Sequence, residues 1–94
     1  MTLTATAIEK EQIKGLKFPK GEVLKTRDEI LQRKTDLQRA MVLGNTEHGK
    51  IRITFDTDDG VKVVETTVWA ATETEVSLKG GVNIPLHAIY RVSM

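Results

Sequence analysis

Between residues 26 and 50 the apolar positions recur at helical spacing. Ile30, Leu37, Ala40 and Met41 fall on one side of a helix, with Leu31 flanking them. Thr26-Arg27-Asp28-Glu29 has the spacing of a capping box, with Thr26 as the N-cap and Glu29 at the third helical position. Gly44-Asn45 permits a left-handed C-cap. The pattern therefore predicts a helix over about residues 27–43.

From Lys50 onward the hydrophobic period is two, which is typical of half-buried strands. Ile51, Ile53 and Phe55 alternate with polar residues in the first such segment. In the long second segment the alternation changes phase, and a bulge or sharp bend near Val63-Val64 would explain the change. The strands are predicted at residues 50–56, 61–71, 75–79, 82–85 and 89–93.

The turn residues indicate how these strands are joined. Asp59-Gly60 and Gly80-Gly81 are hairpin signals, because glycine adopts the positive φ that closes a tight turn. Pro85 cannot donate a ladder hydrogen bond, so we expect that its strand either lies at a sheet edge or ends at Pro85. His87-Ala88 suits one tight turn before the last strand.

Residues 1–25 carry a weaker pattern and are treated as an N-terminal arm before the domain of residues 26–94. Thr6-Ala7-Ile8-Glu9 has capping-box spacing, and Gly15 could end a short helix over residues 7–14. The apolar spacing is poor, so a loose arm is the alternative.

One helix followed by five short strands predicts an α+β fold that is mainly β. We expect an N-terminal helix covering the mouth of a five-stranded antiparallel barrel of the SH3-like kind. The expected core consists of apolar residues from the helix and the inward strand positions: Ile30, Leu37, Met41, Ile51, Ile53, Phe55, Val68, Val76, Leu78, Ile84 and Ile89.

Composition narrows the function classes. The 94 residues suffice for one domain, and they include no cysteine, which excludes disulfides, cysteine-ligated zinc and a thiol nucleophile. No apolar run is long enough to span a membrane, and the N-terminus does not read as a signal peptide, so a cytoplasmic protein is expected. Residues 1–50 hold ten Lys and Arg against seven Asp and Glu, whereas residues 51–94 hold four against six. This asymmetry allows a basic helical face.

The segment Ile84-Pro85-Leu86-His87-Ala88-Ile89, together with the Asp59-Gly60 hairpin, resembles a known group. Residues 26–94 resemble the Sm-like and Rof-like small barrels, which have an N-terminal helix, five bent strands and a one-turn connection before the last strand. The resemblance implies a barrel fold and, for some members, RNA binding. Only His87 matches an RNA-contacting position of the family, because Pro85 and Leu86 stand where the RNA-binding members place an aromatic residue and a lysine.

Basic residues of the helix and the first strand are candidates for contacts with phosphates. The alternative is a solvated face of mixed charge, since Asp28, Glu29 and Asp36 lie nearby. The candidate contact residues are Arg33, Lys34, Arg39, Lys50 and Arg52, together with Trp69 and His87.

Trp69 and His87 each allow two interpretations. Trp69 faces outward if Val68 faces inward, and it would then anchor a base or a protein partner. Alternatively, strand bending places it under the arm or the helix. His87 is either a structural, half-buried turn residue or a ligand contact.

Neither catalysis nor a cofactor is expected. The chain offers no convergent acid, base and nucleophile. Its two histidines, His48 and His87, belong to no spaced set of metal ligands, so no metal site is predicted.

The leading functional hypothesis is therefore a non-catalytic binding module that contacts RNA, single-stranded DNA or a nucleic-acid-handling protein through its basic face. The alternative is a protein-interaction or dimerisation domain with no nucleic-acid role. Such a domain would use exposed strand edges or Trp69 to bind a protein partner or a second copy of the chain.

Overall fold

The computed structural model describes residues 5–47 and 49–93. Within these ranges the fold is α+β and mainly sheet, with one long helix and seven strands in two sheets. Along the chain the elements are β1 (Thr6–Ile8), the 3-10 helix η1 (Lys10–Gly15), α1 (Arg27–Glu47), β2 (Ile51–Thr57), β3 (Gly60–Thr66), β4 (Val68–Ala71), β5 (Glu75–Leu78), β6 (Val82–Pro85), the 3-10 helix η2 (Leu86–Ala88) and β7 (Ile89–Ser93).

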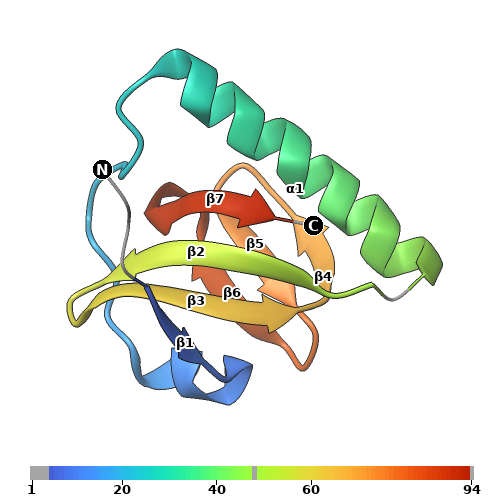
Figure 1. Cartoon of the computed structure of the whole chain (residues 1–94), viewed down its shortest axis with the longest axis horizontal. Coiled ribbons are helices and arrows are strands. Elements are labelled where there is room, and N and C mark those ends of the chain that lie inside the picture. The colour runs from blue at the N-terminus through green and yellow to red at the C-terminus, as the bar shows by residue number, and fades with distance from the viewer. Residues whose placement is uncertain (1–4, 48, 94) are drawn as a thin grey trace.

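The strand order is β1-β3-β2-β7 in one sheet and β4-β5-β6 in the other (Figure 1). The long strand predicted over residues 61–71 is present as β3 and β4, which are separated only by Thr67. The bend expected near Val63-Val64 is wrong, because both residues stay in regular register with β2. The chain instead passes between the sheets at Thr67, and a register shift follows between Val68 and Ala70.

The expectation of a closed barrel with an N-terminal helix needs two corrections. The strands in the described ranges form two sheets and no closed barrel, and α1 lies in the middle of the chain, after β1 and η1. The physical reason is the position of α1, which packs against both β4 and β7, as Figure 1 shows. On that side of the molecule α1 lies between β4 and β7, and these two strands do not pair with each other.

The start of α1 follows the prediction and its end does not. Thr26 and Glu29 form the capping box: the Glu29 amide donates to Thr26 Oγ1 at 3.2 Å, and the Thr26 amide donates to Glu29 Oε1 at 3.3 Å. The helix continues through Gly44 to Glu47. Gly44 is buried within it, and an added Cβ would overlap the carbonyl oxygen of Val68 and lie 3.0 Å from Thr67 Cγ2. Glycine serves here to bring the helix against β4 rather than to end it.

The segment before α1 contains a short helix that ends at Gly15, but it is the 3-10 helix η1 over Lys10–Gly15 rather than a helix over residues 7–14, and the unpredicted strand β1 precedes it. β1 pairs in parallel with β3, and η1 follows directly after it. Ile13 of η1 is only 1% exposed, and the Phe18 ring lies 6.0 Å from the Phe55 ring, centroid to centroid. These side chains close one end of the core.

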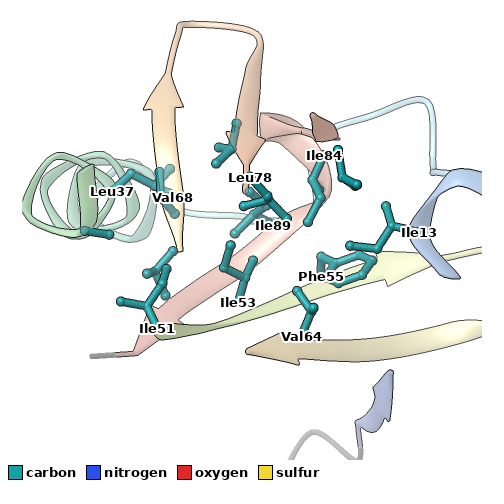
Figure 2. Packing of buried hydrophobic residues seen from close by; sticks show 14 residues of the cluster. Ile13, Leu37, Ile51, Ile53, Phe55, Val64, Val68, Leu78, Ile84 and Ile89 are labelled. Atoms are coloured by element: carbon teal, nitrogen blue, oxygen red, sulfur yellow. The ribbon is translucent and has the colours of Figure 1, made fainter. Parts of the chain in front are cut away.

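The core joins both sheets, α1 and η1. Figure 2 shows Leu37 beside Val68 at one end of the packed side chains, with Ile13 and Phe55 at the other. Nine of the eleven predicted core residues are buried, but Ile30 is 36% exposed and Met41 only partly buried. Both lie at the margin of the helical face, which is centred on Arg33, Leu37, Ala40 and Gly44. The buried residues that the pattern missed include Ile13, Leu24, Val64, Val82 and Val92.

In the described part of the chain, no helix is both long and apolar enough to cross a membrane.

Candidate functional site

A groove of about 460 Å³ lies between α1 and the end of β4. Buried Leu37 and the partly buried Ala71 and Leu86 supply its apolar floor, and Ile30 adds a further apolar side chain. Polar groups surround this floor on both walls. The complete lining is Ile30, Arg33, Lys34, Leu37, Gln38, Ala71, Thr72, Glu73 and Leu86.

The helix forms one wall of the groove because of its residue spacing. Ile30, Lys34, Leu37 and Gln38 recur at intervals of four, three and one, so they share one side of α1. Near its C-terminal end the helix contacts β4 closely at Gly44 and Val68. The groove therefore lies beside the N-terminal half of α1, away from this close contact.

The opposite wall is an edge of the second sheet. β4 is the outermost strand in the order β4-β5-β6, so one row of its backbone groups faces α1. Two other edges are covered: the Ile89 carbonyl of β7 accepts a hydrogen bond from Arg33 Nη1 at 2.9 Å, and β6 packs against η1. The edge of β4 opens onto the groove at Ala71.

Arg33, expected at an exposed phosphate-binding face, is 4% exposed. Its Nη1 donates to Glu22 Oε2 at 2.7 Å, and its Nη2 lies 2.5 Å from Glu22 Oε1. The bidentate hydrogen bond from Arg33 holds the pKa of the Glu22 carboxyl below its usual value of 4.5. Arg33 is therefore occupied inside the protein, and its assignment as a surface contact is wrong.

The remaining basic candidates do not form a continuous face. Lys34 lies on the wall of the groove, whereas Arg39 is exposed roughly 140° away around the helix axis, given 3.6 residues per turn. Arg52 forms an exposed salt bridge with Glu65 at 3.2 Å. Lys50 lines a separate polar cleft. The other charged residues that line this cleft are Lys10, Lys79, Glu9, Glu11 and Glu65. Acidic groups thus accompany the lysines of that cleft.

Trp69 is 48% exposed, so its side chain faces outward and is not covered by the N-terminal segment or the helix. The register passes from Val68↔Leu78 to Ala70↔Ser77, which leaves Trp69 at the bulge of β4. Ala70 next to it is exposed, and Ser77 Oγ donates to Asn83 Oδ1 at 2.8 Å on the neighbouring strands. The indole therefore belongs to an open sheet surface with small neighbours.

His87 has a structural role in the turn before β7. Its Nε2 lies 2.6 Å from the carbonyl oxygen of Pro19, so Nε2 carries the proton and donates it. The His87 carbonyl accepts a hydrogen bond from the Val23 amide at 2.9 Å. Both contacts hold the segment between η1 and α1 against the second half of the chain.

The sequence pattern did not predict the partner of Arg33 or the strand residues that line the groove. Glu22 lies in an aperiodic segment, and no local signal pairs it with Arg33. Ala71 and Leu86 each follow or end a predicted strand, and their approach to α1 depends on the fold. His48 lies outside the described residues. No cluster of three or more His, Cys, Asp or Glu suited to a metal ion is found among residues 5–47 and 49–93.

Scans against family models, curated proteins and solved structures give no match. The fold and the groove define a small α+β domain with a concave, partly apolar surface beside a strand edge.

Proposed function

We propose that this protein is a non-catalytic cytoplasmic module that binds a segment of another protein in the groove between α1 and β4. The single observation that carries the proposal is the groove itself, about 460 Å³ in volume, with an apolar floor next to a strand edge. Ligand sites of proteins are concave, mainly apolar and provided with a few polar groups.

The polar groups of the groove support binding rather than catalysis. Thr72 Oγ1 is engaged in its own turn, where it accepts hydrogen bonds from the Thr74 and Glu75 amides. Lys34, Gln38 and Glu73 offer charge and hydrogen bonds, but they do not make up a nucleophile with its activating base. Such groups orient a ligand and give specificity.

Neighbouring alanines on opposite sides of β4 provide a matched test. Ala71 lines the groove, whereas Ala70 is exposed on the outer face. Peptides that bind the full chain would be selected from a displayed library of random dodecapeptides and then synthesised. Ala71→Leu should weaken their binding at least about tenfold by filling the groove, and Ala70→Leu should leave it within about twofold. Failure to select any peptide, or equal effects of both variants, would contradict the proposal.

Contact with RNA or single-stranded DNA is the second candidate. The exposed side chains of Lys34, Arg39, Lys50 and Arg52 favour it. The turn η2 before the last strand also supports the proposed resemblance to Sm-like barrels. Binding of mixed-sequence RNA should then fall steeply with salt, and Arg39→Glu should flatten that dependence by about one unit. No binding even at low salt would exclude this candidate.

A further inference from the structure

We infer that the partner segment binds as an added strand on β4, with an apolar side chain on the groove floor and, two residues away on the same face, an acidic side chain at Lys34. This inference rests on the proposed function and specifies the conformation and chemistry of the partner.

Two of the other sheet edges are already covered. Arg33 and α1 cover β7, and η1 lies against β6. On β4, Gly44 of α1 covers the carbonyl of Val68, and the groove begins farther along at Ala71. An extended peptide in the groove would lie beside this open edge, where its amides and carbonyls could extend the ladder.

Strand alternation decides where the side chains of an added strand would point. Consecutive residues of an added strand point to opposite faces of the sheet. One residue would therefore face the floor made by Leu37, Ala71 and Leu86. The next would face outward, on the same side of the sheet as exposed Ala70 and Trp69. The residue two positions from the first faces the groove again, where it meets the helix wall.

Charge decides the chemistry of this second groove-facing residue. Lys34 is exposed on the helix wall, and it forms no salt bridge with any described residue. The neighbouring charge of Arg33 is already balanced by Glu22. Glu73 stands on the turn that forms the opposite wall. An acidic side chain on the helix side of the peptide is therefore complementary to the groove.

The strand geometry is tested with one selected dodecapeptide and its single N-methylated analogues. N-methylation removes an amide donor, so binding should weaken about tenfold or more at alternate residues and stay within about threefold at those between. Uniform tolerance, or sensitivity at intervals of three and four, would overturn strand addition. The proposed function would still stand if Ala71→Leu blocked that peptide, and it would fail if no peptide bound.

The acidic preference is tested by exchanging charges on both partners. The selected peptide should bind the native chain about fivefold more tightly than its Glu-to-Lys or Asp-to-Lys analogue at the position facing Lys34. Lys34→Glu should reverse this preference. Arg39→Glu is the matched control, because Arg39 is exposed on another side of α1, and it should leave the preference unchanged. An unchanged preference in Lys34→Glu would overturn the assignment of the acidic residue.

Discussion

At the scale of single residues, Arg33 shows how a charged group becomes part of the interior. Its guanidinium joins three segments: α1, the linker through Glu22, and β7 through the Ile89 carbonyl. Buried charges of this kind persist only when they are paired and hydrogen-bonded. Charge reversal at Arg33 would therefore disrupt the fold, and it cannot serve to test surface binding.

We expect Arg33→Met to lower the free energy of unfolding by about 2–3 kcal/mol. The change leaves the Ile89 carbonyl without this donor and removes the partner of Glu22, which is still partly solvated. Arg39→Met is the control, and its effect should stay within about 0.5 kcal/mol because Arg39 is exposed. Urea denaturation of both variants measures this difference, and equal midpoints would contradict the burial of Arg33.

The ion pair also predicts a pH dependence. Arg33 lowers the folded pKa of Glu22 below 4.5, so the pair stabilises the protein at pH values above the carboxyl's unfolded pKa. This stabilisation is lost as the pH falls through the lowered folded pKa. The native chain should therefore exceed Glu22→Gln in stability at pH 7, and the difference should shrink at pH values below 4.5. A difference that stays constant over this range would contradict the pairing.

At the scale of elements, the contact between α1 and β4 sets the shape of the groove. The missing side chain of Gly44 lets the helix approach Val68, and the groove lies beside the other half of α1. A helix covering the start of an edge strand also protects that edge from pairing with other chains. Only the later part of the edge is left for a ligand.

We expect Gly44→Ala to destabilise the protein by about 1–3 kcal/mol, although alanine favours helices. The added methyl group would overlap the Val68 carbonyl, and this overpacking outweighs a helix-propensity gain of about 1 kcal/mol. Gly21→Ala is the control, because an added Cβ there meets no atom within 4 Å. Thermal denaturation compares the two variants. A more stable Gly44→Ala would show that helix and strand lie farther apart.

At the scale of the whole molecule, one hydrophobic core serves both sheets, the helix and the segment before it. Ile53 of β2 is fully buried in this core, along with Val68 of β4 and Ile13 of η1. Because these elements share one hydrophobic core, none of them is stabilised by a core of its own. The domain should therefore unfold as one cooperative unit.

Ile53→Ala should lower the free energy of unfolding by about 2–5 kcal/mol, the usual cost of a large-to-small change in a packed core. The fluorescence of Trp69, which is the single tryptophan, and the far-UV circular dichroism should change at the same denaturant concentration. Separate transitions for the two signals would show that β4 unfolds apart from the rest.

The sequence by itself determined the local elements. Alternation placed the strands after α1 within one or two residues, apart from the break at Thr67 in the second segment, but it did not predict β1. Thr26 with Glu29 marked where α1 begins. The glycine of the β2–β3 hairpin, Gly60, has the expected positive φ of 105°. These features depend on interactions between residues a few positions apart, which leave a readable spacing.

Only the tertiary structure decided which groups meet across the fold. Arg33 contacts Ile89 at a separation of 56 residues, and His87 contacts Pro19 at a separation of 68. Arg33 occupies a helical position that local pattern alone makes polar and exposed, and its burial depends on Glu22 and β7 arriving from elsewhere. The groove and the open sheet likewise exist because α1 lies between β4 and β7. Such contacts carry no period along the chain, since packing between distant segments creates them.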